Sequence, residues 1–373
     1  DRQTDRQTDR QTDRQTDRQT DRQTDRQTDR QTDRQTDRNG NIDFIRIIAC
    51  VAVVGLHTFP KNLSIAMATL YYLCGFAIPV FFMSSGYFLL NRGALNYRYS
   101  IRKCAKIIRT VFLWNIIIFA LKFVKHFILG TISEIGILTF WNVFAKSFIQ
   151  KGTFWHFWYF GALLLVYLLV PLLSRLKCKQ KRICLLVCGL VCVTAEVSSF
   201  LCGTPIQSNI IQTFRVWTWL FYFLLGSEIT KIYEWLSTRC NIKIHFAVCG
   251  LVTILVIIYQ NYVGSKMILE TTGILHAEYF YDSLLEMAWI ILLFSFVLRI
   301  KFTGQMIERI SEMASLTMGI YIIHPFVRMV TYKVIGNSTA LRSIVYYVCT
   351  LLGAAIITWI IKKMPIGKYL VKL

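Results

Sequence analysis

About ten apolar runs, each close to the length of a membrane-spanning helix, constrain the fold more than any other feature of this sequence. A helix that rises about 1.5 Å per residue needs about 20 mostly apolar residues to cross a hydrocarbon layer about 30 Å thick. The runs occupy residues 44–59, 66–90, 107–129, 155–173, 183–202, 214–233, 244–262, 279–298, 313–331 and 343–361. Because backbone polar groups must be satisfied inside the bilayer, these runs predict an all-α polytopic membrane protein with about ten transmembrane helices.

Charge supports the same interpretation. The chain is 54% hydrophobic and 14% aromatic, which excludes an ordinary soluble domain, and its formal net charge is +21. Basic residues gather in alternate gaps between the runs, at 92–106, 175–182, 231–243, 299–309 and 362–372. This positive-inside pattern predicts a cytoplasmic N-terminus and a cytoplasmic C-terminus. Basic residues spread over short gaps argue against nucleic-acid binding.

The chain begins with a repeat. Residues 1–36 repeat Asp-Arg-Gln-Thr, followed by Asp37 and Arg38, with no apolar side chain. Such a segment cannot bury a core, so the sequence predicts disorder over residues 1–38 and a transmembrane domain over 39–373. The first run lacks a small-residue cleavage site, so we expect it to be retained rather than removed as a signal peptide.

The repeat also has a genetic interpretation. The codons GAC, AGA, CAG and ACA encode its four residues and together repeat the tetranucleotide GACA. Gain or loss of one four-base unit shifts the reading frame, so expression could switch on and off between generations. A translated tract upstream of the true start is the alternative, because no initiator Met is present. Switched bacterial genes often alter the cell envelope, so the repeat favours an envelope role.

Two ionisable residues lie in the first apolar run. Arg46 and His57 are 11 positions apart, which at about 100° per residue places them on one helix face with about 16 Å of rise between them. Ionisable groups in a membrane segment usually face an interior cavity and mark chemistry or transport. The charge pattern puts Arg46 towards the cytoplasm and His57 towards the outer face.

Three motifs in this order carry a family resemblance. The first run holds Arg46-x10-His57, the second ends in Phe81-Phe82-Met83-Ser84-Ser85-Gly86, and the ninth contains Tyr321-Ile322-Ile323-His324-Pro325. Together they resemble acyltransferase family 3, the membrane enzymes that O-acylate bacterial surface glycans, and especially its enterobacterial common antigen O-acetyltransferase-like branch. The resemblance runs from about Asn41 to the C-terminus and implies a location in the inner membrane of a bacterium.

The resemblance implies an O-acetyltransferase that moves an acetyl group from cytoplasmic acetyl-CoA to a hydroxyl of a cell-envelope polysaccharide or lipid-linked glycan, without a metal. Arg46, Lys106 and Arg109 would bind the phosphates of the donor. At the family's Arg-x-x-Arg position this chain has Lys106 in place of the first Arg, which keeps the charge but not the bidentate fork. His57 would deprotonate the acceptor hydroxyl or carry the acetyl group itself.

Seven further residues are candidates for substrate binding, and five of them have a structural alternative. His324 would orient substrate or bond a neighbouring helix, and Trp155, His156 and Trp158 would form a sugar platform or an interfacial aromatic belt. Ser85 would line an acyl channel or simply allow close helix packing, since it precedes Gly86. The last two are Glu196 and Glu286, which would orient His57 or bind the acceptor.

Two other classes of protein remain open at this point. Buried Arg, His and Glu across many spans also suit a transporter or flippase for a glycan or small anion. Transporters commonly contain repeated halves, and the Tyr-x-x-His-Pro element has no counterpart in the first half of this chain. A membrane sensor without chemistry would leave Arg46 and His57 unexplained. The sequence does not indicate an oligomeric state.

Overall fold

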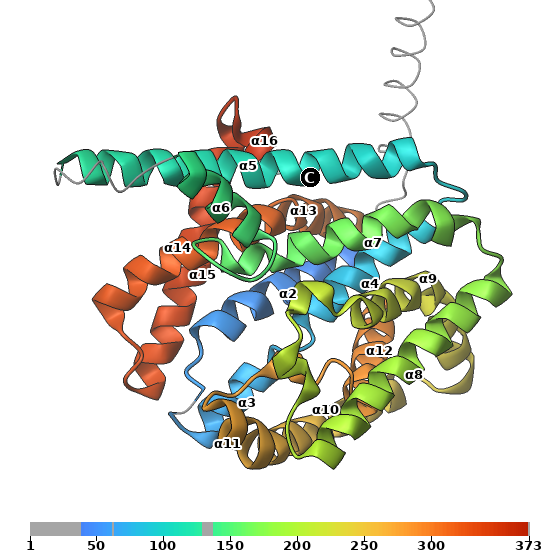
Figure 1. The fold of residues 1–373 in the computed structure, drawn as a ribbon. Coiled ribbons are helices and arrows are strands. Elements are labelled where there is room, and N and C mark those ends of the chain that lie inside the picture. Colours follow the sequence, from blue (N-terminus) through green and yellow to red (C-terminus); the bar gives the residue numbers. More distant parts are fainter. Residues whose placement is uncertain (1–38, 62, 129–136, 372–373) are drawn as a thin grey trace, which may run out of the picture. The chain divides into compact units, whose positions relative to one another are not determined.

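All regular structure in the described chain is helical. This computed structural model describes residues 39–61, 63–128 and 137–371, and no strand occurs in those segments. From Gly40 onward the chain packs as one unit (Figure 1). The all-α prediction is confirmed, whereas the N-terminal repeat lies outside the described residues.

Each expected run falls on one helix or on neighbouring helices. The main helices are α2 (Gly40–Thr58), α3 (Ile65–Leu73), α4 (Ala77–Leu90), α5 (Tyr97–Ile128), α7 (Trp158–Arg175), α8 (Cys178–Cys202), α9 (Val216–Arg239), α10 (Ile242–Val263), α12 (Leu284–Leu298), α14 (Thr317–Ile335) and α15 (Ala340–Lys363). Shorter turns and helices connect them: α6 (Ile137–Ser147), η2 (Trp155–Phe157), η3 (Ile206–Asn209), η4 (Gln212–Phe214), η5 (Gly264–Ile268), α11 (Leu269–Thr272), η6 (Ala277–Tyr279), α13 (Gly304–Ala314) and α16 (Gly367–Val371).

Fewer helices than expected are both long and apolar enough to span a membrane. The described part of the chain has seven such helices, or eight if α13 and α14, which meet at a 45° bend, form one span. Two expected spans differ for identifiable reasons. At 15 residues, α12 is short for a bilayer, and α9 carries Glu228 and Lys231 in its second half.

The helices divide into an interior set and a perimeter set. In the most apolar window of each span, 67% of the residues of η2–α7 and 56% of those of α2 are buried, against 11% for α8 and 17% for the segment that contains α10. The perimeter helices expose large apolar side chains such as Leu186, Leu190 and Leu251. Exposed apolar faces of this extent suit contact with lipid.

Helices α4 and α9 approach most closely at two glycines. A Cβ atom at Gly86 would lie 1.8 Å from the carbonyl oxygen of Phe223, and one at Gly226 would lie 2.0 Å from that of Met83. No side chain fits at either position while the backbones stay in place. The Ser84-Ser85-Gly86 sequence therefore permits direct backbone packing between these helices.

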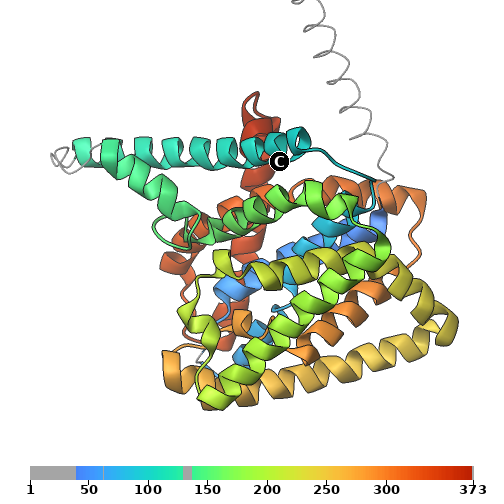
Figure 2. The same cartoon turned by 45° about the vertical axis from the view of Figure 1, so that its right-hand side comes forward.

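Helix α2 lies inside the bundle, where it contacts α4, α12, α13, α14 and α15 (Figures 1 and 2). Its first turn is fastened by Asn41, whose side-chain amide donates to the carbonyls of Val297 and Ile300, each at 2.7 Å. Near its other end, the Tyr347 hydroxyl donates to the Val51 carbonyl at 3.3 Å. These bonds fix the position of α2, and with it the positions of Arg46 and His57.

Candidate functional site

Three segments that are distant in sequence meet at the last turn of α2. The His57 ring stacks on the His324 ring of α14, with centroids 5.2 Å apart and planes 17° from parallel. On another side, the Trp155 ring of η2 meets His57 edge-on at 5.0 Å. The structure therefore brings together three residues that the sequence analysis selected separately.

The tautomer of His324 follows from its surroundings. Its Nδ1 lies 3.1 Å from the carbonyl oxygen of Ile320, one helical turn earlier. Because a carbonyl can only accept, this bond requires the proton on Nδ1 and leaves Nε2 as an acceptor in the neutral ring. Nε2 is buried and makes no hydrogen bond within the described chain. An acceptor without a partner beside His57 is a place where a hydroxyl or a water can bind.

The second histidine of the cluster, His156, is deeper than expected. Its side chain is buried, its ring centroid lies 6.0 Å from that of His324, and the Tyr321 hydroxyl donates to its backbone carbonyl. Burial disfavours a place for His156 in an interfacial aromatic belt, and a role in binding a sugar stays a prediction. Trp158 is also buried and packs on Trp219, with ring centroids 5.2 Å apart. Of these aromatic candidates, Trp155 makes the direct ring contact with His57.

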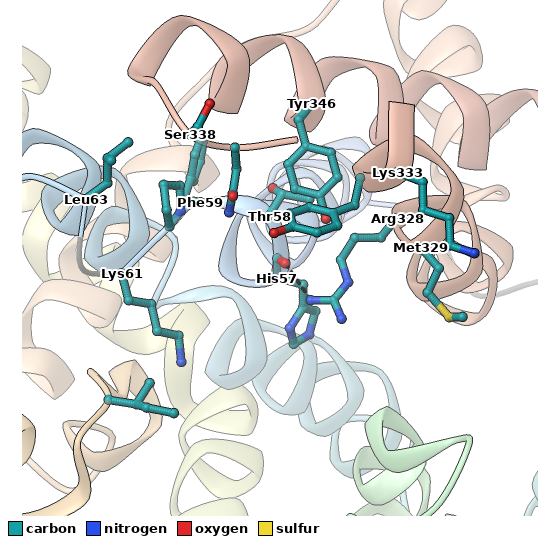
Figure 3. Close-up of a pocket in the computed structure, with 14 residues that line it drawn as sticks. His57, Thr58, Phe59, Lys61, Leu63, Arg328, Met329, Lys333, Ser338 and Tyr346 are labelled. Carbon is teal, nitrogen blue, oxygen red and sulfur yellow. Dashed lines mark hydrogen bonds between the residues drawn. The ribbon is translucent and has the colours of Figure 1, made fainter. Parts of the chain in front are cut away.

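A cavity of about 860 Å³ opens beside His57 (Figure 3). Its wall is formed by the last turn of α2 and the segment after it, by Ile274 before η6, and by α14, the α14–α15 connection and α15. Arg328 lies on this wall, and its Nη1 donates to the His57 backbone carbonyl at 2.8 Å. Lys61 contributes a second positive charge on the opposite side of His57 in this view.

The sequence analysis missed both of these basic residues. Arg328 is an Arg within an apolar run, four positions after His324 and so on the same helix face, which was a usable signal. Lys61 follows the first run directly, where a Lys is usually taken for a headgroup anchor. Its position beside His57 depends on the fold of residues 59–61, which the sequence pattern does not specify.

Lys61 lies near a carboxylate that is already paired. His276 Nδ1 is 2.8 Å from Glu278 Oε1 in the connection around η6. Burial acts to raise the pKa of the Glu278 carboxyl, but the His276 hydrogen bond and the charges of His276 and Lys61 outweigh it and lower that pKa to about 2. Glu278 is therefore a carboxylate at neutral pH. For Lys61, burial lowers the pKa and the Arg328 charge adds to this, while Glu278 acts in the opposite direction.

Arg46 lies three turns before His57 on α2. Its Nη1 is 3.0 Å from Oδ1 of Asp43, and about 30% of its side chain is exposed. The Asp43 carboxylate, one turn earlier on the same helix, therefore offsets part of the cost of placing the Arg46 charge in hydrocarbon.

The other two basic candidates lie on α5, which packs against α7, α6 and α16. The Arg109 guanidinium lies over the Tyr369 ring at 4.7 Å, and Lys106 is half-buried. The adjacent Thr110 hydroxyl donates to the Tyr369 carbonyl at 3.1 Å. In this structure Arg109 therefore stabilises the docking of α16, and a role in binding the donor stays a prediction.

The remaining candidates lie apart from His57. The Tyr259 hydroxyl donates to Glu196, and the Gln260 amide donates to Glu286 at 2.8 Å, so both carboxyl groups belong to a polar cluster between α8, α10 and α12. The Ser85 hydroxyl donates to the Phe81 carbonyl at 2.9 Å, within its own helix. A serine nucleophile activated by His57 would require contact between the two, and Ser85 does not provide it.

Comparison with known proteins identifies a family that this chain matches. A family described as an acyltransferase domain matches residues 39–362. The chain is also similar to a protein of Enterococcus faecalis named amino-acid racemase, with 27% identity over 345 residues that cover 88% of this chain and 47% of that protein. The chain therefore spans about half the length of this curated relative. No solved structure matches it. Within the described residues, no group of three or more His, Cys, Asp or Glu side chains could hold a metal ion.

Proposed function

This chain belongs to the acyltransferase domain family, and from that premise we propose that it moves an acetyl group from cytoplasmic acetyl-CoA to a hydroxyl of an envelope polysaccharide or lipid-linked glycan. The observation that carries this proposal is the position of His57, on the wall of a large cavity and stacked on the buried His324. The positive-inside pattern predicts that this cavity faces away from the cytoplasm, where an envelope glycan would be available.

The geometry supports a role for His57 as general base. In the direct mechanism, the acceptor oxygen attacks the thioester carbonyl carbon while His57 takes the hydroxyl proton. The carbon–sulfur bond then breaks, and the departing thiolate of coenzyme A takes that proton from His57. In the alternative, a ring nitrogen of His57 attacks the thioester carbonyl, the carbon–sulfur bond breaks, and the departing coenzyme A thiolate takes the ring proton. The acetyl group then passes from His57 to the acceptor oxygen, and the hydroxyl proton returns to the ring. Trp155 and His324 hold the ring from two sides in both mechanisms.

The function is tested by comparing envelope glycans from colonies that differ only in the number of four-base units in the repeat. Colonies whose repeat keeps the reading frame should carry acetyl esters, released by mild alkali and detected by mass spectrometry, and frame-broken colonies should lack them. A deletion strain gives the reference without the protein. Acetyl esters that persist in the deletion strain contradict the transferase proposal, whereas a constant repeat number in all colonies contradicts only phase variation.

Arg46 should contribute to use of the donor. Replacing Arg46 by Ala should raise the KM for acetyl-CoA about tenfold, because one charge-assisted contact to phosphate is lost, and Arg46→Lys should recover part of it. The measurement is acetyl transfer in membrane vesicles over a range of acetyl-CoA concentrations. Asp43→Asn is the control, since it breaks the Arg46 ion pair but keeps the cation. An equal rise in KM in Asp43→Asn would make Arg46 structural.

A further inference from the structure

The cavity beside His57 is strongly biased in charge. Lys61, Arg328 and Lys333 line it, and none of the described residues on its wall is Asp or Glu. Uncharged polar groups also line it, from Thr58, Tyr332, Asn337, Ser338 and Tyr346. These hydroxyl and amide groups suit a sugar, whereas three cations without a carboxylate on the described wall leave a positive charge that a negatively charged occupant would compensate.

These cations retain unused capacity to bind an anion. Arg328 donates to the His57 carbonyl through Nη1, which leaves the rest of a five-donor guanidinium for a ligand. The Lys61 ammonium lies 4.8 Å from the centroid of the Tyr71 ring, and the nearby Glu278 is held by His276. Among the described residues neither Arg328 nor Lys61 forms an ion pair at contact distance, although the Glu278 charge acts on Lys61 from further away. A partly buried cation is costly unless a negative charge compensates it, so a bound anion would stabilise both side chains.

The position of Arg328 also fixes where the anion would lie relative to the chemistry. Its hydrogen bond to the His57 backbone places the guanidinium next to the residue that we assign as base or acyl carrier (Figure 3). An anion bound by Arg328 and Lys61 would therefore hold a neighbouring hydroxyl of the same molecule near His57. Such binding at a distance from the reacting atom positions a substrate for reaction.

We propose that the acceptor carries an anionic group of the phosphate or carboxylate class beside the hydroxyl that is acylated, and that Arg328 and Lys61 bind this group. This inference rests on the proposed function and names the class of acceptor. It makes the cavity a specificity site, where a charged glycan or sugar phosphate is preferred over its uncharged counterpart.

The test uses the full chain in phosphatidylcholine nanodiscs, with coenzyme A in excess to occupy the donor site and inorganic phosphate as the probe. We expect saturable phosphate binding by calorimetry, weakened about tenfold by Arg328→Gln and by Lys61→Gln, since each removes one charge-assisted contact. The matched control is Lys301→Gln, an exposed Lys outside the cavity lining, which should leave phosphate binding unchanged. If Arg328→Gln fails to fold, Lys61→Gln carries the test.

Several results would overturn the inference. Absence of phosphate binding, or an equal loss in Lys301→Gln, means that the cavity is not an anion site. If phosphatidylglycerol in the bilayer displaces phosphate, the cavity binds a lipid headgroup instead of the acceptor. Equal rates of acetylation for a sugar phosphate and for the free sugar also contradict it. Phosphate binding without acetylation of any glycan would reject the proposed function and leave the anion site standing.

Discussion

His57→Ala should lower acetyl transfer by at least about a hundredfold while the protein still inserts and folds, because a histidine that acts as base contributes about 10²- to 10⁴-fold. The substitution removes a ring on the cavity wall and leaves the backbone carbonyl that Arg328 holds. The measurement is acetyl ester on envelope glycan, with the amount of inserted protein determined in the same membranes. His126→Ala is a matched control, since this histidine lies on α5 and does not line the cavity.

The same variant separates the two mechanisms. If His57 carries the acetyl group, the wild-type protein incubated with labelled acetyl-CoA and no acceptor should become labelled, and His57→Ala should not. If His57 is only a base, neither protein is labelled, although only the wild type transfers acetyl to an acceptor. Full transfer by His57→Ala would remove this residue from both mechanisms.

Gly86→Ala should have the largest effect on stability. The new methyl group would lie 1.8 Å from the Phe223 carbonyl oxygen, which belongs to backbone, so α4 and α9 must separate. The expected loss is more than about 4 kcal/mol, the range reached when a core contact cannot relax. It would appear as a large fall in the unfolding temperature in detergent, or as failure to accumulate.

Gly250 lies on α10, and its replacement by Ala is the matched control for Gly86→Ala. A Cβ atom there has no neighbour within 4 Å, so Gly250→Ala adds a methyl group to open space and improves helix propensity. Its unfolding temperature should equal or slightly exceed that of the wild type. Equal unfolding temperatures for Gly86→Ala and Gly250→Ala would show that α4 and α9 tolerate a wider separation.

Hydropathy and local motifs predicted much of the fold. The apolar runs identified every main helix, because an 18- to 25-residue apolar stretch has few alternatives to a helix in hydrocarbon. They did not predict which helices are interior. Apolar residues suit both lipid and a protein core, so α8 and α7 are both apolar although α8 lies at the perimeter.

The candidate site was likewise predicted only in part from the sequence. Arg46, His57 and His324 stood out because ionisable residues are rare in apolar runs. The residues that contact Arg46 and His57 could not be predicted in the same way. Asp43 lies before the first apolar run, so hydropathy does not identify it as the ion-pair partner of Arg46. Trp155 borders His57 only because η2 folds against α2. Contacts between distant segments follow from tertiary packing, which local patterns do not contain.

The contacts of α2 also set an order of events during synthesis. The Arg46–Asp43 pair is complete within one turn of α2, so it can form as soon as that helix emerges and lower the cost of inserting its charges. The bond between Arg328 and His57 joins residues 271 positions apart. The His57 end of the first span therefore waits in the membrane, without the His324 ring or the Arg328 guanidinium, until the ribosome has made α14.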